Sequence, residues 1–169
     1  MDELLDSTLQ TISEAIKSKR VKSAEVVRGF LDRVEKVNPQ LNALVYSTAE
    51  QAMKLADRAD KALLKQEAIG KLHGIPITIK DSLDTKDTIT TWGTLGRKDF
   101  RPGRDATVVA RFRDQGAILM GKTNTPEFTL SFQTSNLVYG ATNNPFDLSR
   151  TPGGSSGGAA ALIAAGATF

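Results

Sequence analysis

The sequence predicts an α/β fold in which helices cover a β-sheet. Short β-branched apolar runs alternate along the chain with longer segments whose apolar residues recur at helical spacing. The chain of 169 residues is long enough for one domain, and it contains no internal repeat. We therefore expect a single unit, with a helical arm over residues 1–40 and the α/β core over residues 41–169.

The arm contains two helical segments. Ser7 and Gln10 have the spacing of a capping box, and an apolar face of helical period follows them. A second helix is predicted to begin at Ser23 and to end at Asn38-Pro39, because the residue before a proline disfavours helical conformation. Neither segment carries obvious chemistry. We interpret both as an arm packed on the main body, with a partner-binding helix pair as the alternative.

The core begins with a short strand, a helix and a strand that ends in lysine. Residues 44–46 predict the first strand, and residues 49–65 have the apolar spacing of a helix. After a glycine-containing turn, residues 74–80 form an apolar β-branched run that ends at Lys80, and Asp81 follows. A lysine is usually a solvated surface charge. At the end of an apolar strand it can instead be buried, and burial lowers its pKa.

A polar stretch and a short helix follow the lysine strand. We interpret residues 81–104 as a loop, with Trp92 packed inside it and a substrate-facing aromatic side chain as the alternative. Asp105 has the position of an N-cap for the next helix, which is predicted to end at Gly116.

A second apolar run also leads to a lysine. Residues 117–120 predict a strand, and Lys122 follows it closely. Lys122 is therefore a rival to Lys80 as a candidate functional lysine. Residues 124–127 include a proline suited to the first turn of a helix, so we expect another helix to begin there.

Residues 151–158, Thr-Pro-Gly-Gly-Ser-Ser-Gly-Gly, form the most distinctive stretch of the chain. Glycine permits tight curvature and positive φ angles, and the alanine-rich run that follows favours a helix. We interpret the stretch as a tight turn that brings hydroxyl groups to a helix N-terminus, where amide groups favour negative charge. The alternatives are a flexible linker, a structural cap and a phosphate-binding loop. The last needs a Lys-Ser/Thr pair after its final glycine, where this chain has Ala159.

Residues 144–158, preceded by residues 74–81, resemble the amidase signature family. Members of that family are amide hydrolases that use a Ser–Ser–Lys triad. The resemblance implies a mixed β-sheet and no metal or other cofactor. It assigns Lys80 as the base and Ser155 as the bridging serine of the triad, preceded by a cis peptide bond. A lysine that acts as a base must be neutral, which requires a pKa shift of roughly three units from its usual value.

The resemblance also assigns supporting positions. Ser156 is expected to support the turn or to cap the following helix. A polar loop that lines the substrate site is expected at Thr134, Ser135 and Asn136. The glycines expected to support the proton relay are Gly153, Gly154, Gly157 and Gly158.

The family's nucleophilic serine belongs to a second glycine-rich turn, which would lie beyond Phe169. The resemblance therefore implies that these residues are the N-terminal portion of an amidase, which is incomplete without a C-terminal part. We expect this polypeptide alone to be inactive, because the nucleophile and the amides of the oxyanion hole would be missing together. The expected partner is a small-molecule amide, and a homo-oligomer is possible. The alternatives are the glutamine-hydrolysing subunit of a tRNA-dependent amidotransferase and a non-catalytic truncated remnant.

The composition excludes several classes of function. The chain has no cysteine, hence no disulfide framework or thiol nucleophile, and its single histidine, His73, is expected in a loop beside the lysine strand. The net charge of +3 is spread along the chain without a basic run, so we expect no nucleic-acid partner. No segment has the apolar length of a membrane span or of a secretion signal. We therefore expect a cytoplasmic protein that does not bind membranes.

Overall fold

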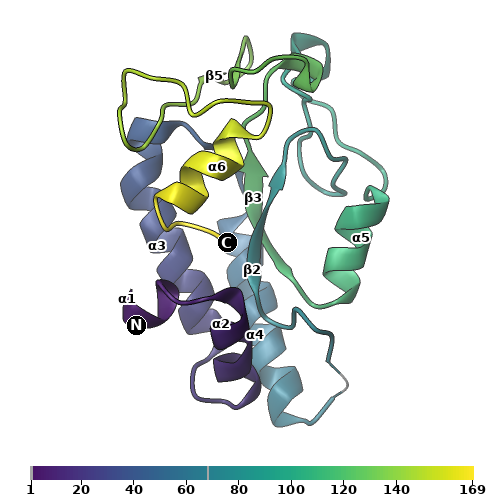
Figure 1. The fold of residues 1–169 in the computed structure, drawn as a ribbon. Helices are drawn as coiled ribbons and strands as arrows, with labels where there is room; N and C mark the ends of the chain where they lie inside the picture. The colour runs from purple at the N-terminus through teal and green to yellow at the C-terminus, as the bar shows by residue number, and fades with distance from the viewer. Residues whose placement is uncertain (1, 68) are drawn as a thin grey trace.

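A three-stranded β-sheet lies at the centre of the computed structural model, which describes residues 2–67 and 69–169 (Figure 1). Its strand order is β1-β3-β2. Strand β2 (Pro76–Lys80) runs parallel to β3 (Ile118–Thr123), whereas β1 (Leu44–Ser47) is antiparallel to β3. The sheet is therefore mixed, and the predicted fold class is confirmed.

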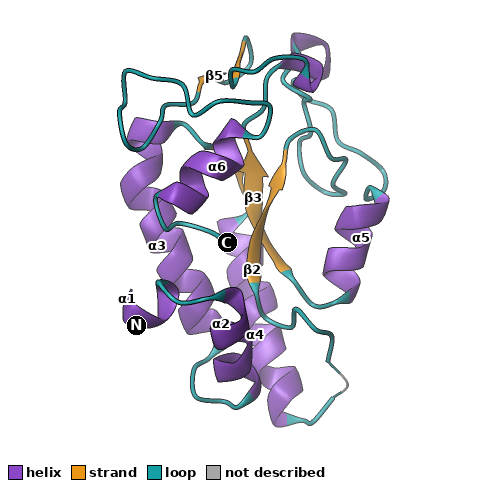
Figure 2. Cartoon of the chain, in the orientation of Figure 1, coloured by secondary structure: helices purple, strands orange, loops and turns teal. Residues whose placement is uncertain are grey.

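Helices cover both faces of this sheet, as Figure 2 shows by element type. The consecutive residues Leu119 and Met120 of β3 belong to different apolar clusters, because successive side chains of a strand point to opposite faces. Leu119 packs with Val109 of α5, whereas Met120 packs with residues of α2 and α3. The helices are α1 (Asp2–Leu5), α2 (Leu9–Lys17), α3 (Ser23–Leu41), α4 (Ala49–Leu64), α5 (Thr107–Asp114) and α6 (Gly157–Ala164).

Short elements occupy the loops between β2 and α6. Two single 3₁₀ turns, η1 (Leu95–Arg97) and η2 (Glu127–Thr129), precede a small hairpin of β4 (Ser135–Asn136) and β5 (Gly140–Ala141). In Figure 1 the hairpin lies above the central sheet, near the start of α6. These loops therefore surround the end of β2 at which Lys80 lies.

The N-terminal helices pack on the main body, as predicted. Ile12 and Ile16 of α2 and Phe30 of α3 form one buried cluster with Ile75 and Met120. Burial of each such side chain contributes on the order of 1.5–3 kcal/mol. The arm is therefore part of the core, and its apolar faces are used there.

The start of α2 differs in detail from the prediction. Thr8 is the N-cap, and its Oγ1 accepts a hydrogen bond from the Thr11 amide at 3.2 Å. The predicted capping box of Ser7 and Gln10 is wrong, because the Ser7 hydroxyl donates to the carbonyl of Leu4.

Helix α3 continues through the proline that was expected to end it. Pro39 lies inside its last turn, and the helix ends at Leu41. A proline so close to a C-terminus removes a single intrahelical hydrogen bond, so apolar packing can maintain the helix. The chain leaves at Asn42, which has left-handed conformation (φ 50°) and donates its amide to the Asn38 carbonyl at 2.8 Å.

Two other predicted boundaries are also wrong. Asp105 does not cap α5, whose N-cap is Ala106. The Asp105 carboxylate accepts from the Lys86 amide and pairs with Arg113 instead. The helix expected at residues 124–127 is limited to the single turn η2, because Phe128 has a left-handed conformation (φ 49°) that a continuing α-helix excludes.

Strand β3 is longer than predicted, and this changes the setting of Lys122. The strand ends at Thr123, so Lys122 lies inside a strand and not after it. Within residues 2–67 and 69–169, every helix is too short or too polar to span a membrane.

Candidate active site

Lys80 and the serines of the glycine-rich turn meet between β2 and α6. The Lys80 Nζ donates to the Ser155 Oγ at 2.7 Å and to the Ser156 Oγ at 3.1 Å. Lys80 is the last residue of β2, and both serines directly precede α6, which contacts this strand. Two sequence motifs that are 75 residues apart are thus joined by direct hydrogen bonds.

Lys80 is only partly buried, and its surroundings lower the pKa of its amine. Burial lowers the pKa of the Lys80 amine from its ordinary value, and it is the one resolved cause of that shift. In the described part of the chain, no carboxylate lies within ion-pair distance of Lys80. The site therefore lacks the negative charge that would hold this lysine protonated.

Ser156 differs from its expected role. It is the N-cap residue of α6, but its side chain makes no capping hydrogen bond. Its hydroxyl is instead the second contact of the Lys80 amine. Both serine hydroxyls are thus available to the lysine.

The turn before α6 depends on glycine at several positions. The Gly154–Ser155 peptide bond is cis, as the family resemblance implies, and Gly153 has a φ of +85°, which favours glycine. A Cβ on Gly154 would lie 2.8 Å from the Ser131 carbonyl oxygen. A side chain at either position would therefore displace the backbone that presents Ser155.

The first two residues of α6 are glycines because other groups lie close to them. A Cβ on Gly157 would lie 2.3 Å from the Thr134 Oγ1. A Cβ on Gly158 would lie 2.4 Å from the Asn124 backbone nitrogen and 2.8 Å from the Ala43 carbonyl oxygen. Gly158 thus allows α6 to approach the backbone that follows β3.

Thr134, expected to line the substrate site, is buried against the turn. Its hydroxyl donates to the Gly153 carbonyl at 2.9 Å and accepts from the Gly157 amide at 3.0 Å. The two bonds connect both sides of the Ser155-Ser156 pair. Both hydrogen-bonding functions of this hydroxyl are therefore used within the protein.

Asn136 is likewise used within the protein, whereas Ser135 is not. The Asn136 amide group donates to the Asn124 Oδ1 and to the Thr125 carbonyl, at 2.7 Å each. Ser135, in contrast, is exposed in β4. Of the three residues in the predicted polar loop, Ser135 is the one whose side chain faces solvent, and the other two shape the loop.

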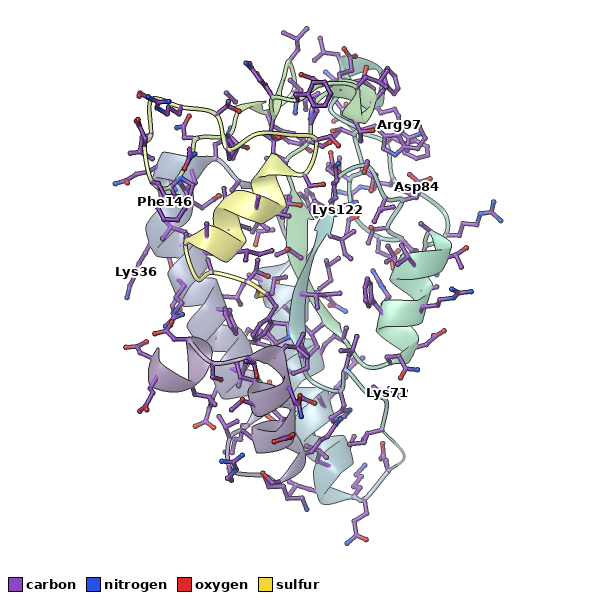
Figure 3. All side chains as sticks on the ribbon, in the orientation of Figure 1. Lys36, Lys71, Asp84, Arg97, Lys122 and Phe146 are labelled. Atoms are coloured by element: carbon purple, nitrogen blue, oxygen red, sulfur yellow. The ribbon has the colours of Figure 1, made fainter. Side chains whose placement is uncertain are left out.

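Lys122, the rival lysine, lies in a different environment. Its Nζ is 3.7 Å from the Asp81 Oδ1, and both side chains are 0% exposed. Burial lowers the pKa of Lys122 to about 8 and raises the pKa of Asp81. Figure 3 labels Lys122 in the interior, whereas Lys36 and Lys71 lie at the surface. Sequence reasoning did not predict this ion pair.

The remaining candidates are structural. Trp92 stacks under the Arg97 guanidinium at 4.1 Å and contacts Phe128 edge-to-face, so its interpretation as a packed side chain is confirmed. His73 is buried in a turn before β2, with its Nε2 3.0 Å from the Ala59 carbonyl. Over the residues that the structure describes, no cluster of three or more His, Asp or Glu side chains is arranged to hold a metal ion.

The contact between Lys80 and Ser155 joins the two motifs on which the family resemblance rests. The Amidase family model matches residues 25–169 of this chain. The chain belongs to the amidase family. Its lysine strand and its Gly-Ser turn both lie inside the matched region.

Individual proteins of known sequence or structure are also similar to this chain. The chain is 43% identical, over 164 residues, to a subunit of the glutamyl-tRNA(Gln) amidotransferase of Sulfurihydrogenibium sp. (strain YO3AOP1), with 97% of this chain and 34% of that protein covered. Its structure is similar to a bacterial aryl acylamidase of the amidase signature family, with a TM-score of 0.90, 34% identity and coverage of 96% and 34% of the two chains. It also resembles the peptide amidase of Stenotrophomonas maltophilia, with a TM-score of 0.89, 29% identity and coverage of 96% and 35%. The chain therefore spans about one third of the length of these relatives.

Proposed function

We propose that the full-length protein hydrolyses the C–N bond of a carboxylic amide, with Lys80 as the base and Ser155 as the proton relay. The contact of 2.7 Å between the Lys80 Nζ and the Ser155 Oγ is the observation that carries this proposal. A base must lie within hydrogen-bond reach of the proton that it accepts, and this distance meets that requirement.

In the proposed reaction, the neutral Lys80 amine accepts a proton from Ser155, which in turn accepts the proton of a nucleophilic serine beyond Phe169. That serine attacks the amide carbonyl, and the new C–O bond gives a tetrahedral intermediate. When the C–N bond breaks, the proton returns through Ser155 to the departing nitrogen. Water then hydrolyses the acyl-enzyme by the same relay.

The turn supports this role by fixing the relay serine. Thr134 bonds to residues on either side of Ser155, and Gly158 permits close contact between α6 and the backbone after β3. We propose that Gly153, Gly154 and Gly157 serve the same purpose. Substrate contact is proposed for the exposed Ser135, whereas the adjacent threonine and asparagine act through the shape of the loop.

A second candidate is that the amide is the side chain of glutamine. The relatives described above include one subunit of a glutamyl-tRNA(Gln) amidotransferase. The same Lys80–Ser155 relay would then release ammonia for transfer, in an assembly with further subunits. A panel of glutamine, simple primary amides and anilides distinguishes the two, and glutaminase activity that rises with charged tRNA, ATP and partner subunits would favour this candidate.

The test of the relay uses the full-length protein and amide-release assays. We expect Lys80→Ala and Ser155→Ala each to lower kcat by about 10²–10⁴-fold, because each removes a general acid–base group. Ser149→Ala is the matched control, since Ser149 is an exposed serine whose hydroxyl bonds to the nearby Asp147. Wild-type rates in both relay variants would contradict the mechanism. Absence of both amide hydrolysis and labelling by a covalent serine probe in the wild type would favour a non-catalytic remnant.

A further inference from the structure

A buried ion pair lies directly behind the residue that contacts the two serines. Asp81 follows Lys80 in the chain, and its carboxylate pairs with Lys122 on the adjacent strand. We propose that Asp81 and Lys122 are positioning residues, which together hold the end of β2 so that Lys80 is directed at Ser155. This inference rests on the proposed function, because it takes Lys80 as the base.

The register of the sheet separates the two lysines. Ile79 is paired with Lys122 and Lys80 with Thr123, and paired residues of adjacent strands share a face. The Asp81 amide donates to the Thr123 carbonyl at 2.9 Å, which extends the ladder by one residue. Lys80 and Asp81 therefore leave the chain on opposite faces. Fixing the Asp81 side chain on one face fixes the direction of Lys80 on the other.

The Lys122 ammonium is saturated by the loop that follows Lys80. It donates to the Leu83 carbonyl at 2.7 Å, to the Thr90 Oγ1 at 2.8 Å and to the Thr85 Oγ1 at 3.1 Å. An ammonium group has three N–H donors, so each has an acceptor in one loop. The lysine thus attaches that loop to β3, next to the end of β2.

The Asp81 carboxylate closes the same loop from the other side. It accepts hydrogen bonds from the Thr91 amide and from the Thr91 hydroxyl. The Asp81 carbonyl accepts from the Trp92 amide at 3.1 Å. The loop that follows Lys80 therefore comes back to Asp81 at Thr91 and Trp92. The backbone of Asp81 cannot rotate without breaking several of these hydrogen bonds.

The pair also removes an electrostatic conflict. A free carboxylate adjacent to Lys80 would favour the protonated lysine and would weaken it as a base. Lys122 compensates that charge on the far face, and burial is the one resolved cause of the lowered pKa of Lys80. An apolar side chain in place of Asp81 would avoid the conflict, but it would not supply the directional bonds that fix the loop.

The test observes the Lys80 amine directly, by NMR of full-length protein with isotope-labelled lysine side chains. In the wild-type background, Ser155→Ala should shift the Lys80 Nζ resonance, because it removes the hydrogen bond. In the Asp81→Asn/Lys122→Met background, which leaves no unpaired buried charge, we expect Ser155→Ala to cause a much smaller shift. The same double variant should lower kcat about 10²-fold with KM unchanged, as expected for a misdirected catalytic group.

Two further variants keep the test decisive. Thr91→Val leaves both charges in place and removes the hydroxyl that donates to the Asp81 carboxylate, together with the bond that this hydroxyl accepts from the Gly93 amide. We expect it to reduce the response as well, and it replaces the double variant if that protein does not fold. Thr88→Val is the matched control, since it removes one buried bond of the same loop, to the Thr85 carbonyl, without touching the pair. It should keep the wild-type response.

An undiminished Ser155→Ala response in both the double variant and Thr91→Val would overturn the positioning role. If Lys80→Ala kept full activity, the proposed function would fail. The NMR response would still decide whether the pair directs Lys80.

Discussion

A lysine lies on each face of the sheet near the ends of β2 and β3, and the two lysines have different contacts. Lys80 is partly buried and contacts two serine hydroxyls. Lys122 is fully buried, pairs with Asp81 and donates to three further acceptors. The Lys80 amine contacts hydroxyl groups that can exchange a proton with it, whereas the donors of Lys122 are all used to hold one loop. The partners of each lysine, more than its place near a strand end, indicate its role.

The largest expected difference between the two faces is in stability. Lys122→Met leaves Asp81 buried without its partner, so we expect the free energy of unfolding to fall by about 3–5 kcal/mol. Lys80→Met removes a partly exposed side chain and should change it by less than about 1 kcal/mol. Urea unfolding of both variants measures the comparison. Equal losses would mean that the two lysines have the same structural role.

The helix that carries the serines offers a second comparison. Gly158→Ala forces a Cβ against the Asn124 backbone, and we expect it to cost about 1–3 kcal/mol and to lower activity. Gly103→Ala is the control, because a Cβ there meets nothing within 4 Å. Thermal unfolding and amide-release assays distinguish them, and a Gly158→Ala protein as stable as Gly103→Ala would show that α6 is not tightly seated.

An effect of similar size is expected for the threonine behind the turn. Thr134→Val removes both hydrogen bonds of its hydroxyl, which should cost about 1–3 kcal/mol because a buried carbonyl and amide lose their partner. Thr107→Val, at the exposed first residue of α5, is the matched control. We expect only Thr134→Val to lower kcat. An unchanged kcat in Thr134→Val would show that the hydrogen bonds of Thr134 do not affect the proton relay.

The last comparison concerns the pH dependence of stability. The folded-state pKa of Lys122 is lowered to about 8, so between that pH and about 10 the unfolded chain binds more protons than the folded protein. Stability should therefore rise with pH in this window, and the rise should be weaker in Lys122→Met. Denaturation midpoints measured at a series of pH values give the two slopes. Equal slopes of stability against pH in the wild type and in Lys122→Met would show that Lys122 does not cause the pH dependence.

The sequence was sufficient for the features that depend on local patterns. The Lys80 strand, the turn at Ser155 and the class of fold followed from β-branched runs and from a glycine-serine motif. The long-range contacts were harder. Nothing local indicates that Asp81 meets Lys122, since that contact depends on the register of two strands.

The misjudged elements share a physical cause, in that tertiary contacts overrode a local signal. Packing maintains α3 through Pro39 despite the lost hydrogen bond. Thr134 was expected to face a substrate, but its hydroxyl holds the backbone of the turn. A threonine at such a position has no sequence signal that separates the two roles.

The most direct test of the central claim is a double-mutant cycle on kcat/KM in the full-length protein. The variants are Lys80→Ala, Ser155→Ala and the two combined, with a responsive amide as substrate. Residues that act as one relay lose their function together, so the double variant should be no slower than the slower single variant. If the two effects multiplied instead, Lys80 and Ser155 would act independently, and the relay would be wrong.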